Sequence, residues 1–215
     1  MRAAAEQLDA SLLVVGASHR GRFGRVLPGG VAERLLHTAP CALAVAPRNF
    51  SGSTNGIGRI GVAFVDTAEG REALAAAAAM AVLGGATLSI CTVLDPPAAS
   101  DAERRASARA VVDRAVASVP TDVLAEVELL DGDAGHALAA ASAELDLLVC
   151  GSRGFGRLLG TLVGGVSGTL AHSCACPLIV LPRERHGAVR SSRHQLAEDS
   201  QGRPEMASQR HGSAG

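Results

Sequence analysis

The chain has 215 residues, a formal net charge of −1 and 47% hydrophobic residues, a composition typical of a globular protein with a sizeable core. It contains no Trp or Tyr and four Phe, so few aromatic side chains are present on which nucleic-acid bases could stack. The balanced charge argues against a basic binding face. No stretch approaches the roughly 20 apolar residues of a membrane span, and the N-terminus lacks a signal-peptide pattern. We therefore expect a cytoplasmic protein that binds neither nucleic acid nor membrane, with its five cysteines reduced.

The first 48 residues predict only part of an alternating α/β unit. Helices are expected at 2–8 and 31–37, and strands at 11–15 and 42–46. The first three strands of a full unit are absent. Residues 49–58 are rich in Gly and Ser and are interpreted as a linker.

Residues 59–183 predict a complete unit in which five strands alternate with helices. The strands are expected at 60–65, 87–93, 123–129, 147–150 and 176–181, and the helices at 69–83, 100–119, 134–144 and after Val166. Such alternation with near-continuous apolar strands indicates an open parallel sheet covered by helices on both faces. Residues 184–215 contain few apolar side chains, so we expect a disordered tail.

The most informative stretch runs from Leu147 to Gly165. A short apolar strand leads into Gly151, Ser152, Arg153 and Gly154, and nine further residues separate these from Gly164 and Gly165. A strand followed by a glycine-rich loop and a helix presents backbone N–H groups to phosphate, because glycine allows tight turns and close approach. The spacing is G-x2-G-x9-G.

The N-terminal segment repeats this stretch. Residues 12–48 align without a gap on 147–183, and 17 of the 37 positions are identical. His19 stands where the second copy has Gly154, and this loss of flexibility argues against phosphate binding by the first copy.

These motifs resemble the ATP-binding branch of the universal stress protein family, in which the glycine pattern is followed by Ser or Thr. Here Gly165 occupies the place of that hydroxyl residue. The resemblance implies a five-stranded sheet of order 3-2-1-4-5, preceded by a C-terminal half-copy of the same fold. It also implies a ligand crevice where the strand order reverses, between strands 1 and 4.

The same resemblance assigns residues of the crevice to parts of ATP. Asp66 and Val93 would contact the adenine, and Gly132 would lie near the ribose. The triphosphate would be held by Gly151, Ser152, Arg153, Gly154, Gly164 and Gly165. From the residues alone, Asp66 could instead form a turn or cap a helix, and Gly132 could equally be a turn glycine. Val93 could be plain core, which does not exclude a contact with adenine.

Other motifs do not support catalysis or metal binding. His172, Cys174 and Cys176 lie at a helix end and a strand entry, and no second ligand pair completes a zinc site. The chain contains no Lys, which excludes a Walker A loop. We therefore expect a non-enzymatic, ATP-binding regulatory protein of the stress response with no catalytic residues.

A nucleotide-free dimerisation or interaction module of the same fold is the alternative. The family resemblance implies assembly through fifth strands, either as a homo-oligomer or as a pseudo-dimer within one chain. In the latter, residues 42–46 would pair antiparallel with 178–181.

Overall fold

The computed structural model describes residues 1–16, 30–47, 50, 56–94, 100–152 and 165–182. Residues 1–183 form one compact unit, and the description below concerns that unit. Residues 184–215, for which we expect a disordered tail, lie outside the described residues. Among the described residues, no helix is both long and apolar enough to cross a membrane.

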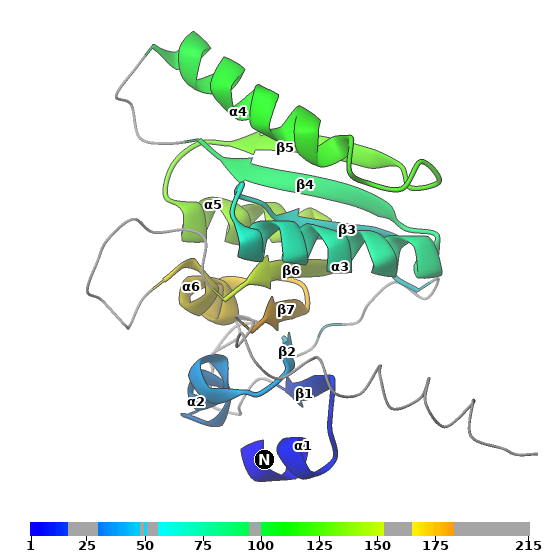
Figure 1. Ribbon diagram of the computed structural model, residues 1–215. Coiled ribbons are helices and arrows are strands. Elements are labelled where there is room, and N and C mark those ends of the chain that lie inside the picture. The colour runs from blue at the N-terminus through cyan, green and yellow to red at the C-terminus, as the bar shows by residue number, and fades with distance from the viewer. Residues whose placement is uncertain (17–29, 48–49, 51–55, 95–99, 153–164, 183–215) are drawn as a thin grey trace, which may run out of the picture. The chain divides into compact units, whose positions relative to one another are not determined.

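The described residues of this unit form one seven-stranded sheet, in the order β1-β2-β7-β6-β3-β4-β5 (Figure 1). The strands are β1 (Leu12–Gly16), β2 (Ala42–Ala46), β3 (Arg59–Ala63), β4 (Thr87–Val93), β5 (Ala125–Leu130), β6 (Leu147–Gly151) and β7 (Leu178–Leu181). All neighbouring strands are parallel except β2 and β7, which are antiparallel. Numbered from β3, the strands of the second copy follow the order 3-2-1-4-5.

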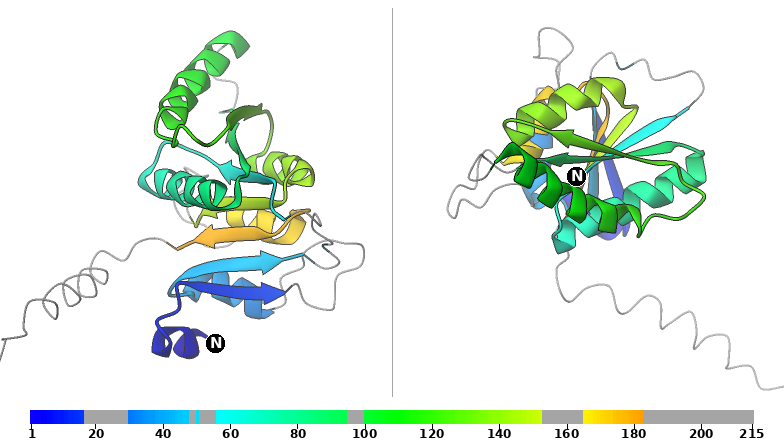
Figure 2. Two further views of the ribbon diagram at one scale, coloured as in Figure 1. Left: turned by 90° about the vertical axis from the view of Figure 1, so that its right-hand side faces the viewer. Right: turned by 90° about the horizontal axis from the view of Figure 1, so that it is seen from above.

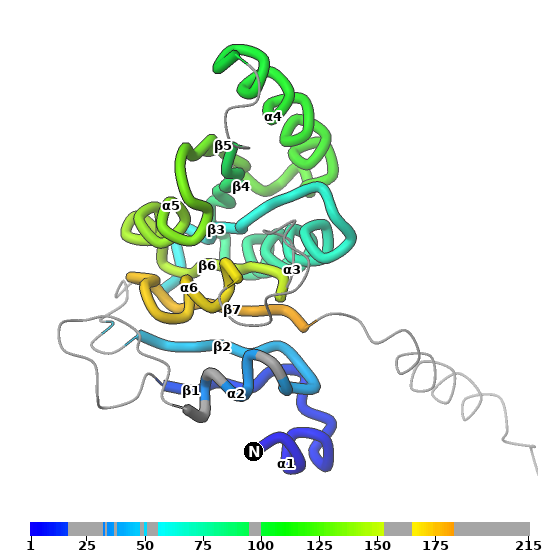
Figure 3. The backbone as a smooth tube through the Cα atoms, turned by 90° about the vertical axis from the view of Figure 1, so that its left-hand side faces the viewer, coloured from blue at the N-terminus to red at the C-terminus, as the bar shows by residue number. Residues whose placement is uncertain are grey.

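The junction between β2 and β7 joins the two sequence repeats. Ala44 pairs with Ile179, and on either side of this pair Leu43 pairs with Val180 and Val45 with Leu178. In the repeat alignment Leu43 corresponds to Leu178 and Val45 to Val180. The register is therefore symmetric about the Ala44–Ile179 pair. The backbone tube of Figure 3 shows β2 and β7 side by side, in the antiparallel pairing expected from the sequence.

Helices cover both faces of the sheet (Figure 2). They are α1 (Arg2–Gln7), α2 (Gly30–Thr38), α3 (Ala68–Gly84), α4 (Asp101–Val116), α5 (Ala134–Ala141) and α6 (Val166–Ser173), with a 3-10 helix η1 (Ser142–Glu144) after α5. In the second copy, α3 and α4 pack on one face, while α5 and α6 pack on the other. The α/β class expected from the alternating pattern is confirmed.

Local sequence signals account for the helix ends. The Ser100 side chain accepts a hydrogen bond from the Glu103 N–H, and Glu103 bonds back to the Ser100 N–H, which completes a capping box. Helix α3 ends at Gly84 and is capped by Gly85, which has φ +62, a conformation that favours glycine. Asp133 caps α5 by accepting from the N–H of His136.

The core consists of apolar layers on the two faces of the sheet. The layer under α3 and α4 includes Ile60, Val62, Phe64 and Ile90, each at most 2% exposed. The layer under α5 and α6 includes Leu138, Leu148, Leu170 and Leu178, all fully buried. A smaller cluster packs α2 on β1 and β2.

Two strands are shorter than the hydrophobic pattern predicts. Strand β3 ends at Ala63 although Phe64 and Val65 are apolar, because the chain turns there and the Thr67 N–H bonds to the Val65 carbonyl at 2.7 Å. Strand β7 begins at Leu178 because Pro177 has no N–H to donate to a ladder. The carbonyl of Pro177 still accepts from the Leu148 N–H at 2.9 Å.

Candidate functional site

The candidate site lies at the carboxyl ends of β3, β4, β5 and β6. Ala63 of β3 is in register with Cys91 of β4 and with Cys150 of β6, so the loops after these strands leave from the same edge. The helix after β3 leads to β4 on one side, whereas β6 leads to β7 on the other. In open α/β sheets, the point where loops diverge in this way is the usual ligand position.

The loop after β3 places Asp66 at this edge. The Phe64 carbonyl accepts a hydrogen bond of 3.1 Å from the buried Thr92 hydroxyl, which ties the loop to β4. Thr67, and not Asp66, caps α3, because its side chain accepts from the Gly70 N–H at 3.1 Å. The interpretation of Asp66 as a helix cap is therefore wrong, and its carboxylate is left for other partners.

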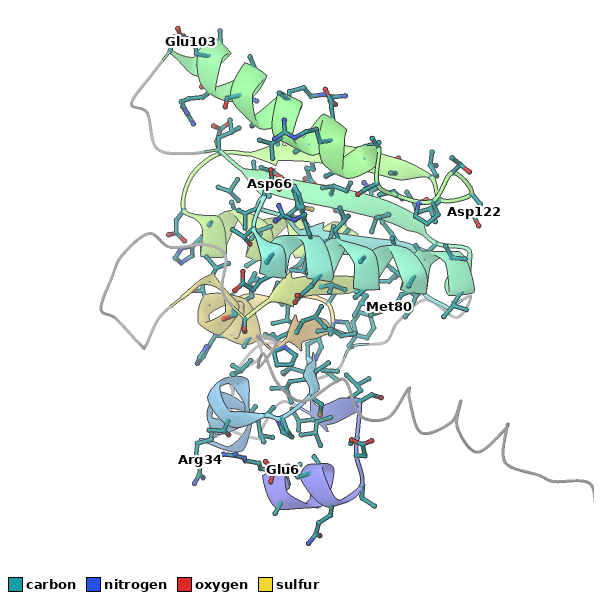
Figure 4. All side chains as sticks on the ribbon, viewed as in Figure 1. Glu6, Arg34, Asp66, Met80, Glu103 and Asp122 are labelled. Carbon is teal, nitrogen blue, oxygen red and sulfur yellow. The ribbon has the colours of Figure 1, made fainter. Side chains whose placement is uncertain are left out.

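Two arginines bind the Asp66 carboxylate. Arg71 of α3 donates to one carboxylate oxygen, and Arg114 of α4 donates to the other at 3.3 Å. Figure 4 shows Asp66 beside the start of α3, with α4 above it. The hydrogen bond from Arg114, followed by that from Arg71, lowers the pKa of Asp66 below its ordinary value. The carboxylate is therefore ionised at neutral pH.

Val93 lies at the end of the next strand, β4, and Gly132 follows β5. Val93 is the last residue of β4 and is half-buried against the layer under α5 and α6. Its neighbour Leu94 extends the ladder, because its N–H bonds to the Leu130 carbonyl at 2.8 Å. Gly132 has φ +105, which a residue with a side chain rarely adopts. The turn itself requires this glycine.

Gly135 brings the start of α5 against α6. A β-carbon at position 135 would lie 2.7 Å from the Thr169 side chain, so only glycine allows this approach. The contact holds the Gly132 turn and the first turn of α6 on the same face of the sheet.

Strand β6 places Gly151 and Ser152 at the same edge of the sheet. Gly151 pairs with Leu181 of β7, and the Ser152 N–H donates to the Leu181 carbonyl at 2.9 Å. Because the backbone N–H of Ser152 is hydrogen-bonded within the sheet, its hydroxyl is the group that can contact a ligand. Gly165 is exposed and precedes α6, with no side chain to cap the first N–H groups of that helix. Arg153, Gly154 and Gly164 lie outside the described residues.

The cysteines near α6 are packing residues in this structure. Cys174 and Cys176 are at most 1% exposed, and the His172 ring bonds to the Gly168 carbonyl at 2.7 Å. Within the described ranges, no group of three or more His, Cys, Asp or Glu side chains is placed to hold a metal ion.

Sequence reasoning missed four residues near the candidate site. Gly70 and Gly135 allow close backbone packing, and Arg71 and Arg114 bind Asp66. The glycines in helical segments were a weak signal of tight packing. Nothing in the sequence indicates that Arg114 reaches Asp66, since 48 residues separate the pair.

The profile of the universal stress protein family matches residues 2–47 and 56–182. The chain belongs to the universal stress protein family. The two matched segments leave out the residues between the repeats and those after Pro182.

Curated relatives agree with this assignment. Universal stress proteins of Mycobacterium tuberculosis and Mycobacterium bovis are 28% identical over 192 residues, which cover 82% of this chain. The chain spans 66% of the length of these relatives.

Solved structures show the same fold. A universal stress protein from Archaeoglobus fulgidus superimposes with a TM-score of 0.66 at 22% identity, covering 85% of this chain and 65% of that chain. A protein described as a putative universal stress protein from Pseudomonas aeruginosa superimposes with a TM-score of 0.65 at 18% identity, covering 84% of this chain and 66% of that chain.

Proposed function

We propose that this universal stress protein binds ATP or a related adenine nucleotide and acts as a regulatory protein of the cytoplasmic stress response. One observation carries the proposal: Asp66, Val93, Gly132 and Gly151 end or follow four strands that meet at one edge of the sheet. This edge includes the point where the strand order reverses. A crevice at such a point is the common position for a nucleotide.

Each part of the nucleotide has a partner in the proposal. The ionised Asp66 accepts from the adenine amino group, Val93 gives an apolar contact, and the Gly132 turn lies at the ribose. The triphosphate meets the Ser152 hydroxyl and the backbone N–H groups before α6, where the positive end of the helix dipole favours anions. From the sequence, Arg153, Gly154 and Gly164 complete this part.

Gly165 weakens the proposed phosphate contact without removing it. Replacing a Ser or Thr by glycine loses one side-chain hydrogen bond, worth about 0.5–1.5 kcal/mol. We expect ATP binding to be up to about tenfold weaker than with a hydroxyl at this position.

A regulatory role is part of the proposal, in place of an enzymatic one. The two arginines lower the pKa of Asp66, so this carboxylate is poorly suited to exchange protons near neutral pH. Nucleotide occupancy would instead bias conformation or assembly.

The alternative is a nucleotide-free interaction module, and the β2–β7 junction favours it. The symmetric register about Ala44 and Ile179 places two repeats edge to edge, with residues 1–48 as the half-copy and 59–183 as the complete unit. In this alternative the protein acts through the pseudo-dimer and binds no nucleotide.

Calorimetric titration with ATP separates the two functions. We expect the wild-type chain to bind ATP and Asp66→Ala to bind it more weakly, because the adenine amino group would lose its acceptor. Gly154→Val should abolish binding, since a β-branched side chain restricts the loop backbone. Absence of heat with the wild-type chain, in a preparation free of co-purified nucleotide, favours the interaction module.

A further inference from the structure

The outer edge of β1 pairs with no other strand in the part of the chain that the structure describes. Figure 2 shows β1, in dark blue, as the last strand at one end of the sheet. Of the seven described strands, only β1 and β5 have a free edge, because the other five pair on both sides. An edge strand presents unpaired N–H and C=O groups to which another strand can bind.

The internal repeat shows how the same edge is covered in the second copy. In the repeat alignment Leu12 corresponds to Leu147 and Val14 to Val149. Strand β3 pairs with β6 and α3 packs on the same face, so Leu147 is 6% exposed and Val149 is fully buried. In the first copy Leu12 is 43% exposed and Val14 is 65% exposed. Side chains that are covered in one repeat are therefore open to solvent in the other.

The exposed side chains of β1 form an apolar row on one face of the sheet. Leu13 and Val15 pack with the cluster under α2, so Leu12 and Val14 lie on the opposite face. Val14 is in register with Ala44 of β2, which packs against the layer under α3 and α4. Strand β1 contains neither a charged residue nor a proline, the features that protect many natural edge strands from pairing.

We propose that β1 pairs antiparallel with β1 of a second copy of this chain, about a two-fold axis at Val14. Val14 of one copy lies opposite Val14 of the other, and Leu12 of each copy lies opposite Gly16 of the other. The two strands are uncharged, so no like charges meet across the pair. This dimer goes beyond the proposed function, and it leaves the β2–β7 junction inside each chain.

The other free edge of the sheet is a less suitable partner for β1. Strand β5 carries Glu126 and Glu128, and charged side chains on an edge strand oppose further pairing. A contact between β1 of one copy and β5 of the next would also leave a free edge at each end, to which further copies could add. Pairing of β1 with itself uses the same surface twice and closes as a dimer.

Light scattering of the full chain at tens of micromolar measures the oligomeric state. We expect a dimer for the wild-type chain and a monomer for Val14→Lys, because the two-fold axis brings the two added charges directly opposite each other. Leu124→Lys is the matched control and should remain a dimer. Leu124 is 66% exposed, much like Val14, and it precedes β5 at the other end of the sheet. Circular dichroism verifies that both variants fold.

A cross-link tests the register of the proposed pair independently. Four of the five cysteines are buried, and Cys41→Ser removes the fifth. In this background Val14→Cys should form a disulfide-linked dimer with oxidised glutathione, because directly opposite residues have Cβ atoms about 4.5–5.5 Å apart. Leu124→Cys in the same background should remain unlinked.

Each outcome decides for or against the β1 dimer. A monomeric wild-type chain overturns the inference, and so does a dimer that persists in Val14→Lys. Loss of the dimer in both lysine variants places the contact elsewhere and overturns it as well. If Val14→Lys does not fold, the cross-link decides, and a Val14→Cys chain that stays unlinked contradicts the pairing. ATP binding is measured separately by calorimetry, so failure of the dimer leaves the proposed function standing.

Discussion

A β-carbon at Gly70 would lie 1.9 Å from the carbonyl oxygen of Val65. No real side chain tolerates such a distance, so the first turn of α3 packs directly on the loop that carries Asp66. The glycine therefore fixes the path of the chain between β3 and α3, and with it the position of the Asp66 carboxylate.

Gly70→Ala should destabilise the fold by about 1–3 kcal/mol, because the backbone must shift to relieve the overlap. Gly168→Ala on α6 is the control, since a β-carbon there meets nothing within 4 Å. That change should be neutral or stabilise by up to about 1 kcal/mol through helix propensity. Urea denaturation of both variants measures the difference, and equal stabilities would contradict the packing argument.

Ser142→Ala should destabilise the fold by about 1–3 kcal/mol. The buried Ser142 hydroxyl donates to the Ala139 carbonyl at 2.6 Å and accepts from the Ala175 N–H at 2.9 Å, so its loss leaves a partly buried N–H unpaired. Ser118→Ala removes only a donor to the Ala115 carbonyl and should cost less. Thermal unfolding that ranks the two variants in the opposite order would contradict this role.

Part of the fold could be predicted from the sequence because its signals are local. The span of β4 matches the predicted 87–93, and the capping box of Ser100 and Glu103 marks the start of α4. The predicted end of β3 and the predicted start of β7 were wrong, because apolar residues continue past the observed strands. A turn at Val65 and the imino nitrogen of Pro177 interrupt the hydrogen-bond ladders there. Hydrophobic pattern alone does not contain those backbone constraints.

Stability should fall as the pH rises above about 9. Burial raises the pKa of the Cys91 and Cys150 thiols from 9.0 to about 12, with the charge of Glu128 also acting on Cys91. Between these values the unfolded chain releases protons that the folded chain retains, so unfolding is favoured as the pH increases.

Urea denaturation at pH 8, 9 and 10 measures this loss. Each thiol contributes at most about 1.4 kcal/mol per pH unit. Cys150→Ala should therefore show a shallower decline than the wild-type chain. An identical decline in both proteins would mean that Cys150 does not remain protonated in the fold.

A chain without residues 1–57 should dimerise through β7. In the full chain β2 covers the edge of β7, with Ala44 opposite Ile179 at the centre of a symmetric register. Removing β2 exposes that edge, and unpaired strand edges seek partners. Light scattering should report a dimer of the shortened chain, and a monomer at the same concentration would contradict this expectation.

The residues of the candidate site could be predicted better than the contacts that they make. The resemblance placed Asp66, Gly132 and Gly151 at strand ends, and each ends or follows a strand at one edge of the sheet. The resemblance did not indicate that Arg71 and Arg114 bind Asp66, because these ion pairs depend on how α3 and α4 pack. An ion pair between residues far apart in the sequence produces no periodic pattern from which it could be predicted.

Native mass spectrometry of the full chain incubated with ATP tests the central claim most directly. We predict one adenine nucleotide per chain, because His19 replaces in the first repeat the glycine found at Gly154 in the second. Asp66→Ala should lower the bound fraction. A wild-type chain that stays free of nucleotide at millimolar ATP would contradict the account, as would binding that is identical in Asp66→Ala.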